Sequence, residues 1–497
     1  MSPPQAAKRG TEAPRMVLPE GRRREGSGGD RDEGMASGLR ERFRERSSRR
    51  LLLGAQSRRL FLQVGLPWGA ALLVGLVSVL YADFSTDVSN AFIACIDGRA
   101  WLAFLITPAL TVLALLLTRR WFTGSEGSGI PQVIAALHAP RTEENTLMRR
   151  LFGVRVIVGK IATSLIGLLG GLTIGREGPT VHIGAAIMAE TRRFYRHSNN
   201  AQLERRLLLA GAAAGLSAAF NTPLAGIIFA IEELARDFES RTNGIMITAV
   251  VFSGLTSLAL AGNYLYFGQI NVADDLGGSF VLPVVLSAVL CGLFGAAFNL
   301  ALLRWRTWMP HWLIELRARK PLLYALTIGI VVAALGVGTH GETWGSGYDQ
   351  ARHLLTGAGA LSEGYAITKW GAMVVTYMAG IPGGLFSPSL SIGAGLAQWV
   401  HAVFGWAPMA GVIALCMTGY LAAVTQSPIT SFVIVMEMTN GTGMVIPMMA
   451  TALVASRISA LFTPPLYEAL AESNYFGVAA LPAGGFLKAK PVPPPGA

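Results

Sequence analysis

The chain has 497 residues, of which 52% are hydrophobic and only 14% are charged, and its mean hydropathy is +0.46. Soluble proteins carry about 25% charged residues, so this composition excludes an ordinary soluble globular protein. Uncharged stretches of about 20 residues are long enough to cross a bilayer as helices. We therefore expect an all-α protein that crosses the membrane several times.

Residues 1–59 form a basic segment with 15 lysines and arginines against 8 acidic residues. Its Gly, Ser, Pro and Arg content offers too few apolar side chains for a core, so we expect a disordered tail. An excess of basic residues favours the cytoplasmic side of a membrane, and we place the N-terminus there. Binding of anionic lipid or nucleic acid by the tail is the alternative, but we expect no nucleic-acid partner.

The first two uncharged runs, 60–82 and 100–118, predict membrane spans. The first leads outward, and its outer loop is expected to carry three aspartates, Asp83, Asp87 and Asp97. The second returns to Arg119 and Arg120. Arginines between 139 and 155 indicate an inner loop there.

Two later apolar segments are interrupted. GREGP at 175–179 leads into a short apolar piece, 178–189, which as a helix would cover only about 18 Å and cannot span the membrane. Asn221-Thr222-Pro223 breaks the uncharged run 207–231 in the same way. Irregular backbone at membrane depth is tolerated only where it lines a cavity or is buried in protein, so these breaks indicate a transport site.

Three motifs occur twice, in the same order. GSGIPQ (127–132) returns as GSGYDQ (345–350), GREGPTVHIGA (175–185) as GLFSPSLSIGA (384–394), and NTPLAGIIFAIEE (221–233) as QSPITSFVIVMEM (426–438). The third pair aligns Glu232 with Glu437. These matches predict two homologous halves, roughly 100–262 and 280–463, as in secondary transporters.

The glycine-rich turns precede three predicted helix starts: after Ser128, at Glu177-Gly178-Pro179, and at Leu385-Phe386-Ser387-Pro388. A helix start exposes unpaired N–H groups and the positive end of the helix dipole. Glycine lets an ion approach that backbone closely. Three such starts aimed at one place would bind a dehydrated anion. Glycines that merely allow helices to pack closely are the alternative.

Arg176 and Glu177 are the only lysine, arginine, aspartate or glutamate residues between Lys160 and Glu190. A carboxylate at membrane depth indicates a functional site. Beside helix N-termini, Glu177 could occupy the anion site itself and leave it on protonation. A buried Arg176–Glu177 ion pair is the alternative, which we disfavour because adjacent side chains rarely face each other.

Together the motifs resemble those of a known family. GSGIP (127–131), GREGP (175–179) and GIPGGLFSP (380–388) are similar to the three anion-binding signatures of the CLC family of chloride channels and chloride/proton antiporters. PPLYEAL (464–470) resembles the segment that bears the family's anion-coordinating tyrosine. The likeness covers roughly residues 60–470. It implies one transmembrane domain of two inverted repeats over that range, followed by a short tail, 471–497. It also implies a homodimer with one anion path per subunit.

The resemblance also implies particular site residues. A central chloride would be bound by the hydroxyls of Ser128 and Tyr467 and the backbone N–H groups of Leu385 and Phe386. An outer chloride would be bound by the N–H groups of Arg176, Glu177 and Gly178. Glu177 matches the gating glutamate, and Lys160 matches a family lysine with an electrostatic role.

Channel and antiporter are distinguished by one inner position. In IEELAR (231–236), Glu233 stands at the position where antiporters of this family have a glutamate that relays protons. Many channels of the family have an apolar residue at that position. The alternative is an ordinary acidic helix end, Glu232 and Glu233, balanced by Arg236. We therefore expect a chloride/proton antiporter in a bacterial inner membrane, with a passive voltage- or pH-gated chloride channel as the alternative. Ser128 stands where a proline accompanies nitrate preference in this family, so we expect chloride over nitrate.

The sequence offers little for other chemistry. An intramembrane enzyme would need Ser128 as nucleophile and His138 as base, without a visible orienting partner, and we expect no enzyme. Cys95, Cys291 and Cys416 are isolated, so we expect neither a disulfide framework nor a metal cluster, and the seven histidines show no metal-binding spacing. We also expect no cofactor. Two departures from the family, Gln132 and Ile134, replace acidic residues found in some members. Only 27 residues follow Leu470, too few for the regulatory nucleotide-binding modules of many eukaryotic members.

Overall fold

The computed structural model describes residues 65–139, 141–195, 201–235, 243–262, 264–270 and 278–476. These residues are helical with connecting turns and contain no β-strand, which confirms the all-α prediction. The predicted N-terminal tail, Arg236 and residues 477–497 lie outside the described residues.

The helices follow in chain order from α2 (Leu66–Ile96). The next are α3 (Ala103–Arg120), α4 (Ile130–His138), α5 (Arg141–Leu151), α6 (Val154–Leu169), α7 (Glu177–Glu190), α8 (Ala201–Phe220), α9 (Pro223–Phe229), the π-helical turn η4 (Ala230–Ala235) and α10 (Asn243–Ala261). The later ones are α11 (Val281–Trp308), α12 (His311–Arg319), α13 (Pro321–Gly338), α14 (Tyr348–Thr356), α15 (Tyr365–Met378), α16 (Phe386–Val403), α17 (Met409–Thr425), α18 (Pro428–Thr439), α19 (Val445–Ala460), α20 (Leu466–Ala471) and the π-helical turn η7 (Glu472–Phe476). Short 3₁₀ turns are η2 (Ala100–Leu102), η3 (Thr191–Tyr195), η5 (Gly278–Phe280) and η6 (Thr442–Met444).

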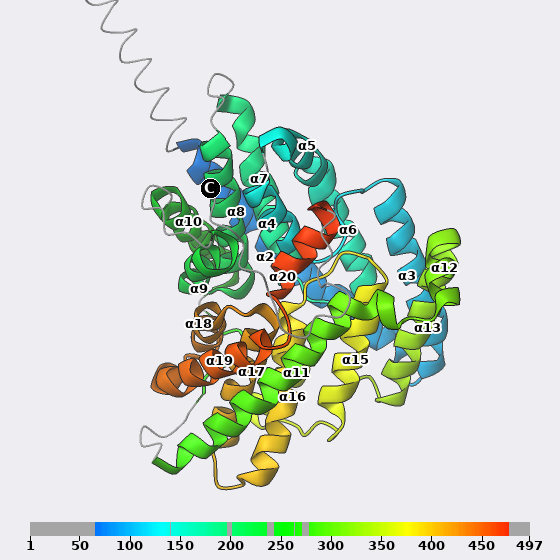
Figure 1. Cartoon of the computed structure of the whole chain (residues 1–497), viewed down its shortest axis with the longest axis vertical. Helices are drawn as coiled ribbons and strands as arrows, with labels where there is room; N and C mark the ends of the chain where they lie inside the picture. Colours follow the sequence, from blue (N-terminus) through cyan, green and yellow to red (C-terminus); the bar gives the residue numbers. More distant parts are fainter. Residues whose placement is uncertain are drawn as a thin grey trace, which may run out of the picture. The chain divides into compact units, whose positions relative to one another are not determined.

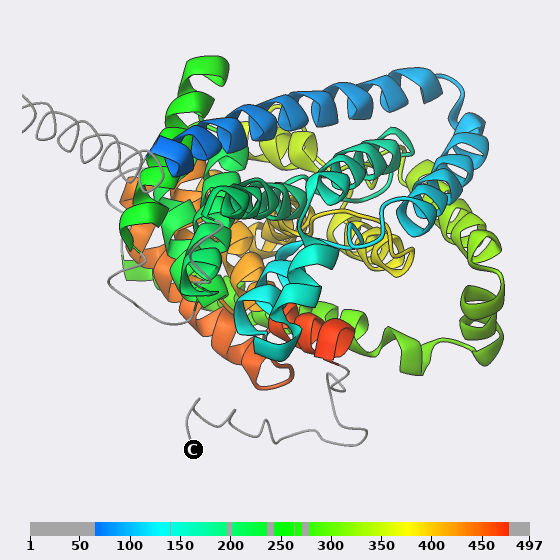
Figure 2. The same cartoon turned by 90° about the horizontal axis from the view of Figure 1, so that it is seen from above.

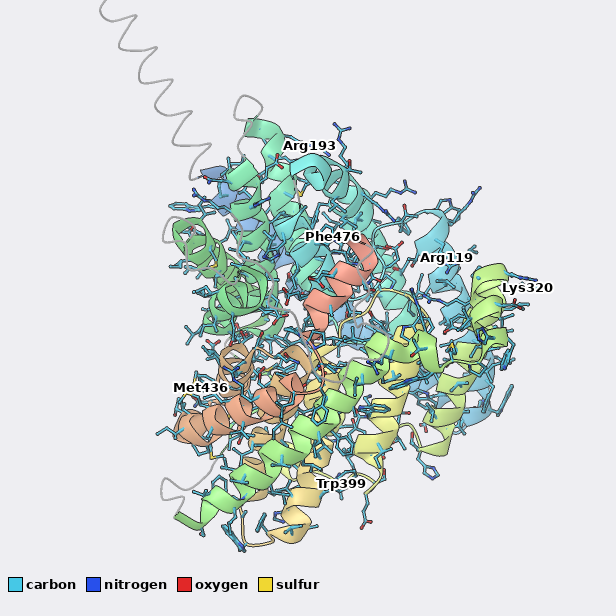
Figure 3. All side chains as sticks on the ribbon, in the orientation of Figure 1. Arg119, Arg193, Lys320, Trp399, Met436 and Phe476 are labelled. Atoms are coloured by element: carbon cyan, nitrogen blue, oxygen red, sulfur yellow. The ribbon has the colours of Figure 1, made fainter. Side chains whose placement is uncertain are left out.

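Six segments of the described chain are long and apolar enough to cross a membrane. They are Leu66–Ile96, Ala100–Arg120, Gly244–Ala261, Val281–Trp308, Pro321–Gly338 and Thr442–Ala460. The protein is therefore an integral membrane protein. Two further apolar helices, Met409–Thr425 and Pro428–Thr439, are shorter than these spans. Helix α7 has only 14 residues, in agreement with the short piece predicted after GREGP. Figure 3 shows side chains over these helices, with Arg119 at the end of α3 and Lys320 at the start of α13 at the same edge of the view.

Two sequence-based boundaries were wrong. The first span does not end near residue 82, because α2 continues to Ile96 and includes Asp83 and Asp87 (Figure 2, blue). No proline or glycine interrupts this part of the chain, and both carboxylates are exposed, so the helix can continue. The predicted inner loop at 139–155 is largely the helix α5.

The duplication in the sequence is visible as repeated packing. Helix α7 packs on α8 as α16 packs on α17, and α9 contacts α18 across the two halves. Asn221 and Gln426, 205 residues apart, both adopt a left-handed conformation, with φ of 56° and 60°, before the prolines that begin α9 and α18. In Figure 1 the helices α4 to α10 (cyan to green) and α15 to α19 (yellow to orange) occupy different sides, and α20 (red) lies against α4.

Candidate anion and proton site

The three glycine-rich helix starts meet in the interior, as predicted. The N–H of Gly383 donates to the carbonyl of Gly127 at 3.2 Å. Gly175 and Gly384 exchange two backbone hydrogen bonds of 2.8 and 2.7 Å, which form an isolated antiparallel bridge between the two halves. These contacts place the starts of α4, α7 and α16 side by side.

Glycine is required where these turns touch. A Cβ on Gly178 would lie 2.3 Å from the Oγ of Ser128 and 3.1 Å from the Cα of Gly384. Gly129 has a φ of 108° and would place a Cβ 2.5 Å from that of His182. Any side chain at either position would push the helix starts apart, so the glycines are required for the convergence itself.

Glu177 is the first residue of α7, and its side chain is fully buried at the start of α16. The backbone N–H of Ser387 donates to Oε2 of Glu177 at 3.4 Å, and the Ser387 hydroxyl donates a short hydrogen bond to Oε1. The hydroxyl of Tyr266 also donates to Oε1, at 3.3 Å. The carboxylate therefore occupies the N-terminal end of a helix in the opposite half, where helix geometry favours an anion.

Arg176 does approach Glu177, contrary to our expectation. Its Nε lies 3.9 Å from Oε1 of Glu177, at the outer limit of an ion pair. Its shorter contacts run elsewhere, because Nη1 donates to the carbonyl of Ala82 at 2.7 Å and to the hydroxyl of Thr86 at 3.1 Å. The guanidinium also lies 5.3 Å from the centre of the Tyr266 ring. Arg176 therefore ties the start of α7 to α2 and contributes only a long contact to the carboxylate.

Ser128, Tyr467, Leu385 and Phe386, the residues predicted for a central anion, are brought together. All four are buried, and α20, which carries Tyr467, packs on α4, which begins just after Ser128. Leu385 caps α16 and Phe386 begins it, so their N–H groups belong to the unpaired first turn. The Phe386 ring stacks on that of Tyr467 with their centres 6.1 Å apart.

Lys160 has a definite structural contact. Its Nζ donates to the carbonyls of Glu126 and Gly127 at 3.2 and 2.9 Å, and so holds the turn that carries Ser128. Lys369 holds the corresponding turn of the second half, with hydrogen bonds of 3.0 to 3.1 Å to three carbonyls, those of Thr343, Trp344 and Gly345. Gln132, one of the two departures noted above, also donates to the Glu126 carbonyl. Both lysines are fully buried.

The two inner glutamates do different things. Glu233 lies in the π-helical turn η4, is 2% exposed, and accepts a short hydrogen bond from the hydroxyl of Ser427. Glu232 instead accepts hydrogen bonds from the backbone N–H groups of Ile429 and Thr430 at the start of α18. Of this pair, Glu232 is a helix cap, whereas Glu233 is buried and contacts a side-chain hydroxyl.

Two cavities approach this region. One of about 760 Å³ reaches Ser128 and is lined by five arginines, Arg119, Arg150, Arg304, Arg306 and Arg317. The other, of about 40 Å³, is lined by residues that include Arg176, Tyr266, Ser346 and Tyr348. Glu177 lines neither cavity.

Sequence reasoning missed four polar residues near the site: Tyr266, Ser387, Ser427 and Lys369. Ser387 and Ser427 stand in motifs that were noticed, but nothing marked their hydroxyls as partners of a distant carboxylate. Lys369 could have been found, since it lies 209 residues after Lys160, the offset of the GREGP repeat. Tyr266 lies in an irregular segment with no motif.

The alternative of an enzyme receives no geometric support. Ser128 precedes α4 and His138 ends it, so about 13 Å of helix separates them. His138 Nδ1 contacts the carbonyl of Ile134. All three cysteines are free, although Cys291 lies against the Cys416 carbonyl at 3.4 Å. Within the described residues, no cluster of three metal-binding side chains occurs.

Comparison with known proteins identifies the family. The family model described as "Voltage gated chloride channel" matches residues 109–460. The chain belongs to this family. The H(+)/Cl(-) exchange transporters ClcA of Salmonella agona (strain SL483) and Citrobacter koseri are 32% and 31% identical over 425 and 426 residues, each match covering 80% of this chain and 85% of the relative.

Solved structures of similar proteins have the same fold as this chain. A slow cyanobacterial Cl-/H+ antiporter superposes with a TM-score of 0.68 at 23% identity, over 82% of this chain and 97% of that one. A CLC-type fluoride/proton antiporter gives 0.66 at 21% identity, over 79% and 94%. The arrangement of two repeats with broken helices is therefore that of this family.

Proposed function

We propose that the protein is a chloride/proton antiporter of a bacterial inner membrane, with its N-terminus in the cytoplasm. The ClcA relatives, which are named as H(+)/Cl(-) exchange transporters, support the reaction. The observation that carries the proposal in this chain is the position of Glu177, whose carboxylate takes the place of an anion at the start of α16.

In this mechanism, chloride and the Glu177 carboxylate compete for the same helix start. While ionised, the carboxylate accepts the donors of Ser387 and blocks the path. Protonation removes the charge that these donors and the helix dipole stabilise, so the side chain leaves and chloride enters. Ser128, Tyr467 and the first N–H groups of α16 then hold the ion with partial charges, which allows release as well as binding.

The proton reaches the cytoplasmic side through Glu233. This carboxylate is buried and accepts a hydrogen bond from the Ser427 hydroxyl. An ionisable group at this position favours an antiporter over a passive channel. The arginine-lined cavity that reaches Ser128 supplies a positive route for chloride entry.

We also propose a homodimer in the lipid bilayer. Leu224 and Ile429 stand at corresponding positions of the two halves, each next to the capped start of α9 or α18, and are 45% and 47% exposed. Two apolar side chains related by the repeat suit a symmetric contact between subunits. Cross-linking of cysteine variants at these positions in membranes should yield a dimer band.

The reaction is tested with purified protein in liposomes. An outward chloride gradient at uniform pH should drive proton uptake, recorded with a pH electrode, and the uptake should stop when the chloride gradient is removed. Chloride efflux without proton movement would support the passive channel instead. Neither flux requires a cofactor.

A further inference from the structure

We propose that Ser387 and Tyr266 form a hydroxyl clamp that holds the ionised gate and sets the pH at which it opens. The proposal rests on the proposed function of Glu177 as the gate. It assigns positioning roles to two residues whose hydroxyls the sequence motifs did not mark as partners of Glu177. Both hydroxyls converge on one oxygen, Oε1 of Glu177.

The clamp is a closed triangle of hydrogen-bonding groups. Ser387 Oγ and Tyr266 Oη each donate to Oε1 of Glu177, and the two hydroxyls lie 3.4 Å from each other. All three side chains are buried. A carboxylate accepts two such donors well, whereas a protonated carboxyl must itself donate one proton and cannot accept as strongly. The clamp therefore favours the ionised, closed gate.

Tyr266 is itself held in place. The hydroxyl of Tyr348 donates to the backbone carbonyl of Tyr266 at 2.7 Å, and the two rings lie edge to face with centres 4.7 Å apart. The guanidinium of Arg176 also lies over the Tyr266 ring, 5.3 Å from its centre. Tyr266 and Tyr348 both line the small cavity, whereas Glu177 does not. Tyr266 thus separates the gate from this cavity and must release Oε1 before the carboxyl can move.

Among the residues that the structure describes, few other charged or titratable groups face Glu177. Arg176 lies at 3.9 Å, and the tyrosines that sense its charge are Tyr81 on α2, Tyr266, and Tyr467 on α20. An unperturbed tyrosine loses its proton only near pH 10, so none of the three titrates near neutral pH. Replacing either clamp hydroxyl therefore changes how readily Glu177 accepts a proton without adding or removing a charge.

The test compares Ser387→Ala and Tyr266→Phe with the wild type in liposomes, with chloride and proton fluxes recorded from pH 4 to 8, roughly the range around a carboxyl group and histidine. Each variant loses one hydrogen bond to the ionised gate. We expect the midpoint of activation to shift by about one pH unit toward higher pH. The chloride-to-proton ratio should stay unchanged, because neither residue carries the proton.

Matched controls exist in the same helices and core. Ser389, on α16, and Tyr420, on α17, are buried, and their hydroxyls have no hydrogen-bond partner among the described residues. Ser389→Ala and Tyr420→Phe should leave the midpoint in place. Ser387→Thr restores a hydroxyl and should return the midpoint toward the wild-type value.

A second arm uses Glu177→Gln, which removes the charge that the clamp holds. Adding Ser387→Ala to that variant should not change the pH dependence further. The proposal is overturned if Ser387→Ala and Ser389→Ala shift the midpoint equally, if Ser387→Thr does not restore it, or if Ser387→Ala still shifts it without Glu177.

The two proposals fail in different ways. A wild-type protein that moves chloride but no protons contradicts antiport, yet the pH dependence of its chloride flux still reports on the clamp. If the wild-type protein is an antiporter but its activation midpoint is the same in Ser387→Ala and Tyr266→Phe, only the clamp proposal is contradicted.

Discussion

Glu232 and Glu437 cap helices in each other's half of the molecule. The Glu232 carboxylate accepts from the N–H groups of Ile429 and Thr430 at 3.0 and 2.6 Å, at the start of α18. Glu437, on α18, accepts from the N–H groups of Leu224 and Ala225 at 3.1 and 2.7 Å, at the start of α9. The repeat-related glutamates thus satisfy unpaired N–H groups reciprocally, and neither is Glu233, the carboxylate that we propose as the inner proton relay.

Because Glu232 caps a helix and Glu233 is the proposed proton relay, we expect substitutions of these two neighbours to affect transport differently. Glu233→Gln should abolish proton flux and leave chloride flux, because the inner relay no longer titrates. Glu232→Gln should keep coupling but lower stability by about 1–3 kcal/mol, since an amide has one acceptor oxygen where the cap uses two. Flux assays and thermal melts of both variants measure this, and equal loss of coupling would refute the assignment.

The proposed role of Glu177 as the gate predicts that its substitution uncouples chloride flux from proton flux. In Glu177→Ala or Glu177→Gln, the side chain can neither block the start of α16 as an anion nor carry a proton. Chloride flux should persist and become insensitive to pH, while proton flux disappears. Proton-coupled transport that survives in the glutamine variant would show that another group carries the proton.

Selectivity is expected to depend on Ser128. Its hydroxyl suits a nearly spherical anion such as chloride, which accepts hydrogen bonds from any direction. Ser128→Pro removes the hydroxyl and a backbone donor together, and should shift coupled exchange from chloride toward nitrate. Proton uptake driven by each anion gives the ratio. An unchanged ratio would mean that this residue does not select the anion.

Tyr467 is expected to bind the central anion through its hydroxyl. Tyr467→Ala should weaken chloride binding by about ten-fold or more, the equivalent of one lost hydrogen bond to an ion. It should also loosen coupling, because a weakly held central anion competes less well with the Glu177 carboxylate for the start of α16. Isothermal titration of detergent-purified protein with chloride measures the affinity, and wild-type affinity in this variant would remove Tyr467 from the site.

The two buried lysines offer a paired test of the turn that carries Ser128. Lys160→Met leaves the carbonyls of Glu126 and Gly127 without their donor, so chloride affinity should fall and stability should drop by about 1–3 kcal/mol. Lys369→Met should cost similar stability but leave affinity near wild type, because its turn does not carry Ser128. Titration and thermal melts of both variants measure this. Equal affinity in the two variants would argue against a positioning role for Lys160.

The sequence was sufficient for the parts of the site that depend on backbone. Gly178 and Gly384 mark the helix starts because only glycine permits their contacts, and Glu177 stands out because charge at membrane depth is rare. The partners of these groups were not predictable in this way. Ser387 is 210 residues from Glu177, and its hydroxyl differs in no local property from that of Ser389, which has no partner among the described residues.

The ends of helices were predicted less well where a charged residue was the only sign of an end. Asp83 and Asp87 seemed to end the first span, but exposed carboxylates do not stop a helix, and α2 continues to Ile96. In contrast, Pro223 and Pro428 both begin helices, as expected from the missing N–H of proline.

The central claim, that chloride and protons move in opposite directions on one protein, is tested most directly by the reversal potential. Purified protein in planar bilayers or liposomes is given a chloride gradient, a pH gradient, or both. An antiporter predicts a reversal potential that depends on both gradients and lies between the chloride and proton values in a fixed ratio. A reversal potential equal to that of chloride, and unmoved by the pH gradient, would contradict the account.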